Sequence, residues 1–324
     1  MRELIMTTRR QTLGLLAAAA LLPIAPRFAF SAAPLSNVAN AGYYRFRFGN
    51  FEVTALSDGT MALPMAKIYQ NEPIDALQRK LDENFLGKEP HISINAYLVN
   101  DGERLVLIDA GTGTLFGPAA GKLIQHLETS GYRADQVDAV ILTHIHADHS
   151  GGLTVDGKPQ LPKATIHVAD REYRFWVDRE GLTSVTEEVD KDLQRAHDAL
   201  APYIATGKVA RFADDADPLP NFGSILRPGH TPGHSSIVLK ANDGQRLVFW
   251  GDVIHGDYVQ FDEPDVFVTF DVDGTAAAAT RALALADAAD GRYLVAGAHL
   301  PFPGIGHVAR DTTLYRFIPW NYVE

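Results

Sequence analysis

The sequence contains no cysteine among its 324 residues. This absence excludes disulfide bonds, thiolate-bound metals, iron–sulfur clusters and a cysteine nucleophile. Basic residues are also in the minority: 29 Lys and Arg stand against 40 Asp and Glu, a net charge of −11. Such a balance argues against nucleic acid or an anionic membrane surface as a partner. Any catalysis must therefore come from histidine, carboxylates, hydroxyl groups or a bound metal, and twelve histidines are present.

The remaining composition is that of an ordinary globular protein. Hydrophobic residues make up 46% and charged residues 21% of the chain, which excludes disordered, collagen-like and coiled-coil classes. The length allows one large domain or two small ones, each with an ample core.

The first thirty residues are typical of an export signal. Three arginines precede a short apolar run, Leu13–Leu22, and small residues close the segment at 29–33. This order is that of a secretory signal peptide, and ten apolar residues are too few for a stable membrane anchor. The pair Arg9 and Arg10 also resembles a twin-arginine signal. An amphiphilic helix is the alternative.

We therefore expect residues 1–33 to be a signal peptide and residues 34–324 to form a single domain. The mature protein would be periplasmic or secreted, with no membrane attachment after signal removal. Loss of residues 1–31 removes four arginines and one glutamate. The mature chain is thus more acidic still, which favours neutral over polyanionic substrates.

Strands and helices mix throughout the rest of the chain. Apolar alternation predicts hairpins at 43–57 and 92–109, and short apolar runs predict further strands at 137–142, 165–168, 208–212, 224–227, 236–240, 246–250 and 293–296. Apolar periodicity predicts helices at 118–130, 170–178, 185–204 and 275–289. The order fits a layered α/β sandwich with function carried on loops at strand ends.

One segment concentrates metal-ligand side chains. His144, His146, Asp148 and His149 lie within six consecutive positions just after the buried strand at 137–142. His144 and His146, two residues apart, can share one metal, while Asp148 and His149 can turn toward a second. Imidazole and carboxylate together suit Zn²⁺, and also Mn, Fe or Co. A polar loop with incidental histidines is the alternative.

Three single residues in similar places extend this pattern. His230 lies in a Gly/Pro-rich turn between two strands, Asp252 follows the apolar strand at 246–250, and His299 follows the strand at 293–296. Any one of them alone would more often be an ordinary hydrogen-bonded residue. Together, and in this order, the three residues are better explained as further ligands of the same metal site than as ordinary polar residues.

The seven residues in this order resemble the metallo-β-lactamase superfamily in its dinuclear hydrolase form. The resemblance implies an αββα sandwich of two mixed β-sheets flanked by helices. It implies one metal on His144, His146 and His230 and another on Asp148, His149 and His299, with Asp252 and a hydroxide bridging them. Asp252 and Asp148 would be the catalytic carboxylates.

Three more polar residues would support the ligands by the same resemblance. They are His234, Asp109 and, less closely matched, Asp58. Hydrogen bonds from such residues orient metal ligands. A purely structural role in turns is the alternative, because turns also favour Asp.

Individual ligands distinguish the branches of this superfamily. Asp252 disfavours true β-lactamases, which place Cys or Ser there, and His146 disfavours the diiron oxygen-reducing branch. Glyoxalase II has the same ligands but a helical glutathione-binding C-terminus, whereas only 25 residues follow His299 here. Acyl-homoserine lactonases usually have a Tyr at the position of His255.

The closest resemblance is to the methyl parathion hydrolase group of exported organophosphorus hydrolases. It rests on residues 250–255, 259–264 and 297–304. That group lines its leaving-group pocket with aromatic side chains, which would be Phe116 and Trp176 here, beside His255. A third aromatic position falls near Leu193, a departure from the pattern. Core packing is the alternative for Trp176.

We therefore expect a hydrolase with two divalent ions, Zn²⁺ above all, that cleaves neutral esters by attack of a metal-bridging hydroxide. Organophosphate triesters with aryl leaving groups are the first expected substrates. Lactonase, arylesterase or glyoxalase II-like thioesterase activity is the alternative, followed by metal binding without catalysis. The resemblance also suggests a homodimer, for which apolar residues at 61–69 and 261–270 could supply a surface.

Overall fold

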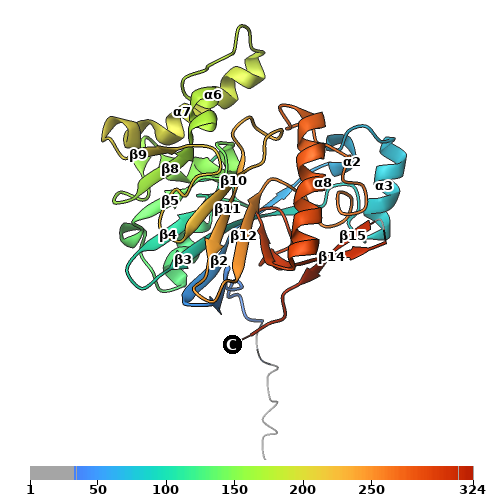
Figure 1. The fold of residues 1–324 in the computed structure, drawn as a ribbon, viewed down its shortest axis with the longest axis horizontal. Coiled ribbons are helices and arrows are strands. Elements are labelled where there is room, and N and C mark those ends of the chain that lie inside the picture. The colour runs from blue at the N-terminus through green and yellow to red at the C-terminus, as the bar shows by residue number, and fades with distance from the viewer. Residues whose placement is uncertain (1–32, 34, 313, 324) are drawn as a thin grey trace, which may run out of the picture. The chain divides into compact units, whose positions relative to one another are not determined.

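The computed structural model describes residues 33, 35–312 and 314–323, so the expected signal peptide lies outside the described residues apart from Ala33. Two β-sheets organise residues 41–324 (Figure 1). The first has the order β1-β2-β3-β4-β5-β8-β9 and the second the order β10-β11-β12-β13-β14-β15. The first sheet is formed by β1 Tyr43–Phe48, β2 Phe51–Ala62, β3 His91–Asn100, β4 Leu105–Ile108, β5 Ala139–Ile141, β8 Thr165–Ala169 and β9 Val209–Phe212.

The second sheet is formed by the later part of the chain. Its strands are β10 Phe222–Leu226, β11 Ser235–Lys240, β12 Arg246–Gly251, β13 Leu294–Gly297, β14 Ile305–Asp311 and β15 Leu314–Pro319. Strands β4, β5, β8 and β9 run parallel, as do β12 and β13, and the other paired neighbours within the two sheets are antiparallel. Both sheets are therefore mixed, as expected. The short strands β6 Thr154–Val155 and β7 Lys158–Pro159 form a separate hairpin.

Helices cover the outer face of each sheet. The central core joins apolar side chains of both sheets, including Phe51 and Phe249. A second core packs α4 Leu123–Thr129, α6 Asp170–Trp176 and α7 Glu187–Ala205 on the first sheet, and a third packs α8 Gly274–Gly291 on the second. The αββα sandwich expected from the sequence is confirmed. The short helices are α2 Met65–Ile68, α3 Ile74–Glu83, α5 Ala147–Ser150, η2 Ala134–Gln136 and η3 Gly151–Leu153.

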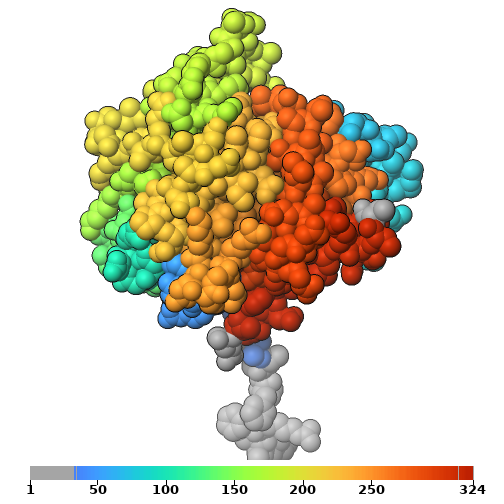
Figure 2. All heavy atoms as spheres, viewed as in Figure 1, coloured from blue at the N-terminus to red at the C-terminus, as the bar shows by residue number. Residues whose placement is uncertain are grey.

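The two longest helices begin at residues that satisfy free backbone donors. The Thr186 hydroxyl accepts from the Val189 N–H at the start of α7, and Asp273 accepts from the Ala276 N–H at the start of α8. The buried face of α7 repeats every three or four residues, as an amphipathic helix requires. The segment around α6 and the start of α7 projects from one end of the unit (Figures 1 and 2).

Several details differ from the sequence analysis. The helix expected at 118–130 begins only at Leu123, because Gly121 adopts a φ of +74° and its N–H bonds the Asp58 carboxylate. Helix α3 and the hairpin β14–β15 were not expected. Among the described residues, no helix is both long and apolar enough to cross a bilayer.

The apolar runs offered as a dimer surface lie mostly inside the chain. Met65, Tyr69, Val266 and Val268 are each at most 2% exposed and share one core cluster. Tyr69 and Val268 also form a β-bridge. The two runs therefore pack largely against each other, which leaves little of them as a free surface, and the homodimer stays a prediction.

Candidate metal centre

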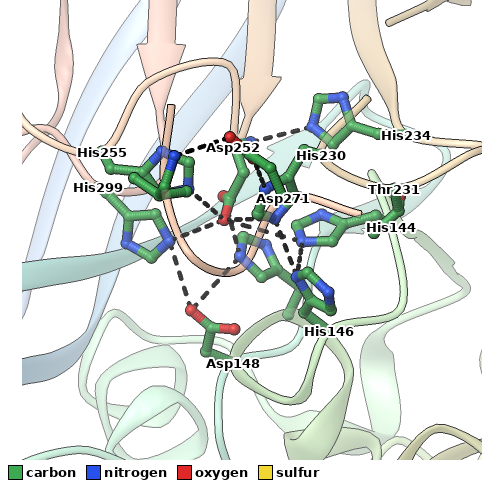
Figure 3. Close-up of polar contacts among 12 residues, drawn as sticks. His144, His146, Asp148, His230, Thr231, His234, Asp252, His255, Asp271 and His299 are labelled. Atoms are coloured by element: carbon green, nitrogen blue, oxygen red, sulfur yellow. Dashed lines mark hydrogen bonds and ion pairs between the residues drawn. The ribbon is translucent and has the colours of Figure 1, made fainter. Parts of the chain in front are cut away.

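The seven expected ligands lie on loops at the carboxyl ends of strands. His144, His146, Asp148 and His149 follow β5, and His230 lies in the turn between β10 and β11. Asp252 follows β12 and His299 follows β13, whose parallel register places Gly251 beside Gly297. Neighbouring parallel strands end at the same edge of a sheet, so their loops meet there. Asp252 lies among the converging imidazoles (Figure 3).

One group of ligand atoms consists of His144, His146, His230 and Asp252. The His146 Nδ1 lies 2.9 Å from the His230 Nε2 and 3.2 Å from the His144 Nε2. The Asp252 Oδ2 lies 3.2 Å from the His230 Nε2. All four ligand atoms lie within 4.8 Å of one another, close enough to converge on a single ion.

A second group consists of Asp148, His149, Asp252 and His299, again within 4.8 Å. The His149 Nε2 lies 3.0 Å from the Asp252 Oδ1, and the His299 Nε2 lies 3.4 Å from the Asp148 Oδ2. Asp252 belongs to both groups and uses a different oxygen toward His149 than toward His230. The geometry thus matches the two-ion arrangement with one shared carboxylate.

Partners on the far side of the rings determine which nitrogen each imidazole presents. The Nδ1–H of His149 donates to Asp109 at 2.9 Å, that of His230 to Asp271 at 2.7 Å and that of His299 to the Ser93 carbonyl at 2.8 Å. In the neutral form of each ring, which is the form that binds a metal, the Nε2 therefore carries the free lone pair. Such partners are the usual support of metal-binding histidines.

Asp109 and Thr143 form a similar chain to His144. The Thr143 hydroxyl donates to Asp109 at 2.9 Å, so it can only accept from the His144 Nδ1–H at 3.1 Å. Asp109 itself has a φ of +60°, a left-handed conformation that few side chains adopt. One strained aspartate thus orients His149 directly and His144 through a hydroxyl.

Two unpaired buried atoms test whether the site fits a metal. The His149 Nε2 and the Asp252 Oδ1 lie 3.0 Å apart but form no well-aligned hydrogen bond with each other or with another group, although both side chains are at most 4% exposed. A buried polar atom without a partner is costly, and a divalent ion would satisfy both. The donor set of imidazoles and carboxylates fits Zn²⁺, Mn²⁺, Co²⁺ or iron. Two bound ions would acidify a water molecule and polarise an ester oxygen.

The electrostatics of the site also favour cations. Burial disfavours an imidazolium, but Asp252 and Asp271 raise the pKa of His230 to about 9, and Asp252 and Asp148 raise that of His299 to about 10. In contrast, burial and the neighbouring His230 lower the pKa of His146 to about 3. Asp252 also raises the pKa of His149 well above its ordinary value, so buried carboxylates hold protons on three ligands where metal charge would otherwise lie.

The residues expected to support the ligands have different roles in the structure. The His234 Nε2 accepts from the Asp252 N–H at 3.0 Å, so His234 positions the loop of the shared ligand. Asp58, in contrast, bonds no ligand. It accepts four hydrogen bonds from Thr112, Gly121 and Leu123, and so holds the 111–123 loop.

A cleft of about 1240 Å³ opens above the ligands. Phe116, Trp176 and His255 all line it, as expected from the sequence. Trp176 packs its ring edge to face against His146, with 5.2 Å between centroids, and is only 4% exposed. Trp176 thus serves both the cleft wall and the core. Leu193 is fully buried on the inner face of α7 and does not line the cleft.

Three residues near the site were missed from the sequence. Asp271 holds His230, Phe270 beside it lines the cleft, and Glu172 is a buried carboxylate in α6. Asp271 lies 41 residues after the histidine it holds, so no local spacing marks it. Glu172 precedes Trp176 by one helical turn, and that spacing is the only local signal.

Comparison with known proteins establishes the family. A family model described as the metallo-beta-lactamase superfamily matches residues 91–299. The chain belongs to this superfamily. A solved structure of the hydrolase AbOPH, also of the beta lactamase superfamily, superposes with a TM-score of 0.84 at 35% identity, covering 89% of this chain and 100% of AbOPH. The dizinc quorum-quenching lactonase AidC superposes with a TM-score of 0.80 at 26% identity, covering 87% and 99%.

Curated relatives match a shorter part of this chain than these two solved structures do. A probable metallo-hydrolase of Mycobacterium tuberculosis is 29% identical over 173 residues, which cover 47% of this chain and 53% of the relative. The acyl-coenzyme A thioesterase MBLAC2 of Homo sapiens is 29% identical over 170 residues, covering 50% and 58%. The match thus spans about half the length of these relatives. Family membership and the paired ligand groups therefore agree with each other.

Proposed function

We propose that this protein hydrolyses neutral esters with two divalent metal ions, zinc in the first place. The observation that carries the proposal is the double ligand group, which shares Asp252 at the base of a largely apolar cleft. Two ions so placed stabilise the charge on both the entering and the leaving oxygen of an ester.

Lactones with an apolar acyl part are the first substrate class. The similarity to AidC, a dizinc lactonase, extends over 87% of this chain. The cleft wall contributed by α6, α7 and the segment between them includes Phe175, Leu182, Val185 and Val189, which suit an acyl chain. The same wall also contains charged residues of both signs, Glu187, Glu188 and Asp192 beside Lys191 and Arg195.

Phosphotriesters with an aryl leaving group are the second class. The supporting observation is the aromatic lining by Phe116, Trp176 and Phe270 close to the ligands. Aromatic faces pack well on a nitrophenyl or similar ring. A flat carbonyl and a tetrahedral phosphorus need different approach geometries, so relative kcat/KM values separate the two classes.

A substrate panel tests the proposal. Zinc-loaded and chelator-stripped protein would be assayed with aliphatic acyl lactones, p-nitrophenyl phosphotriesters, aryl esters and an acyl-coenzyme A thioester. We expect metal-dependent turnover with lactones first in kcat/KM. Asp252→Asn should lose at least about 10³-fold in kcat while keeping the wild-type circular dichroism spectrum. Absence of metal-dependent turnover of every member would overturn the function.

We also propose that the protein is exported through its first 33 residues. The paired arginines, apolar run and small-residue site support this route. A fusion of residues 1–33 to a reporter should reach the periplasm, and replacement of Arg9 and Arg10 by lysine should retain it in the cytoplasm. A cytoplasmic wild-type fusion would contradict export.

A further inference from the structure

Glu172 is a buried carboxylate whose four hydrogen bonds all come from the surroundings of the metal centre. It lies in the first turn of α6 and is 0% exposed. Its Oε1 accepts from the Ile145 N–H at 3.0 Å and from the Trp176 indole N–H at 2.7 Å. Its Oε2 accepts from the Thr231 hydroxyl at 2.8 Å and from the Gly233 N–H at 2.9 Å.

These donors belong to three different parts of the site. Ile145 stands between the ligands His144 and His146, while Thr231 directly follows the ligand His230. Trp176 forms the cleft wall that packs on His146. A single side chain therefore fixes the distance between the first ligand loop, the His230 turn and the wall of the cleft.

The packing around Glu172 shows that this link is close. A Cβ atom on Gly233 would lie 2.3 Å from the Glu172 backbone nitrogen, so only glycine lets the turn approach α6. No Lys or Arg among the described residues forms an ion pair with Glu172, and its charge is balanced by hydrogen-bond donors alone. Ion pairing is therefore not the reason for burying this carboxylate.

We propose that Glu172 is a positioning residue for the ion held by His146 and His230, and that it ties Trp176 to the same ion. The proposal rests on the metal site of the proposed function but not on its substrate. By holding the two ligand segments from behind, Glu172 preorganises the converging nitrogens before the ion arrives. Loss of such outer support weakens metal affinity roughly 10- to 100-fold.

The primary test replaces Glu172 by glutamine. An amide nitrogen in place of Oε1 would face two N–H donors, those of Ile145 and Trp176. In place of Oε2 it would face the Gly233 N–H, while the Thr231 hydroxyl could turn to accept. We expect Glu172→Gln to retain one tightly bound Zn²⁺ by elemental analysis instead of two. The second ion should dissociate roughly 10- to 100-fold faster into a chelating dye.

A finer pair of variants keeps the carboxylate in place. Thr231→Val removes one donor to Glu172 with little change in volume, and Thr231→Ser retains the hydroxyl. We expect faster release of one ion from the valine variant and wild-type release from the serine variant. This pair decides the question even if Glu172→Gln does not fold.

Asp58→Asn is the matched control. Asp58 is equally buried and also accepts four hydrogen bonds, but from the 111–123 loop, and it touches no ligand segment. We expect this variant to lose thermal stability and still bind two ions. Unchanged metal content and release in Glu172→Gln and Thr231→Val, with stability lost as in Asp58→Asn, would overturn the proposal. Failure of the wild-type protein to bind metal would instead refute the proposed function.

Discussion

Single hydrogen bonds behind the imidazoles determine what the ligand atoms can bind. Asp271 illustrates this: its side chain is fully buried, and it accepts from His230 at 2.7 Å and from the Val268 N–H at 2.9 Å. Both oxygens are thus committed to fixed donors. An aspartate so held keeps the proton on the His230 Nδ1 and its Nε2 free for a metal.

We therefore predict that Asp271→Asn lowers metal affinity by roughly 10- to 100-fold at the His230 ion. The single amide oxygen of an asparagine can accept from the His230 Nδ1–H or from the Val268 N–H. Its amide nitrogen, which only donates, would then face the other donor. Titration with a chelator of known affinity measures the change. Wild-type affinity in this variant would show that Asp271 has no role in holding the ligand.

Protons compete with metal at three ligands. Although burial opposes it, Asp252 raises the pKa of His149 well above its ordinary value, that of His230 to about 9 and that of His299 to about 10. All three residues are thus protonated at pH 7 in the metal-free protein. Because a ligand must lose its proton, apparent metal affinity should rise with pH up to at least about pH 10, and binding at pH 7 should release about three protons.

Calorimetric titrations with Zn²⁺ in buffers of different ionisation enthalpy count those protons. A binding enthalpy that does not depend on the buffer would contradict the prediction. Asp148 and Asp252 have lowered pKa values, so they stay ionised and contribute no protons at this pH.

At the scale of elements, the turn that carries His230 is fitted tightly against α8. Gly229 has a φ of +130°, and a Cβ there would lie 2.1 Å from the backbone nitrogen of Ala277. Both the conformation and the space exclude a side chain. The Asp273 N–H donates to the Gly229 carbonyl at 2.9 Å, which joins the turn to the start of α8.

We predict that Gly229→Ala destabilises the protein by about 3 kcal/mol, because it combines overpacking with a strained backbone. The variant should also bind metal more weakly, since His230 must shift with the turn. Urea unfolding and zinc titration measure the two effects. A loss of stability with unchanged metal binding would show that the turn can relax without moving the ligand.

The elements that carry ligands were predictable because each follows a short apolar strand. The pattern was readable at β5, β12 and β13, where hydrophobic runs end directly in His or Asp. Helix α3 was missed because only Leu77 and Leu81 of its ten residues are buried. The late start of α4 was missed because it depends on Asp58, a residue 65 positions away from Leu123.

The same distinction separates the ligands from their supports. Ligand identity follows from residue type and local spacing, whereas Asp271 and Glu172 gain their roles only from tertiary contacts. Phe270–Asp273 contains two aspartates two residues apart; one holds His230 and the other caps α8. No local rule tells them apart.

For the whole molecule, bound metal should act as a stabiliser of the native state. A ligand present at 1,000 times its Kd adds about 4 kcal/mol to the free energy of unfolding. For a chain of this size each kcal/mol corresponds to roughly 2–4 °C in Tm. We predict that EDTA lowers Tm by roughly 10 °C and that Zn²⁺ restores it, as scanning calorimetry would measure. An equal Tm with and without EDTA would indicate that no ion is bound.

The division of the ligands between the two sheets affects when metal can bind during synthesis. Four ligands follow β5 of the first sheet, and the other three lie on loops of the second sheet. During synthesis the first sheet emerges long before His299, so an ion would meet only part of its coordination sphere. Both ions can therefore bind fully only after the chain has been synthesised beyond His299. We expect a chain truncated before His299 to be cleaved by proteases faster than the full-length protein.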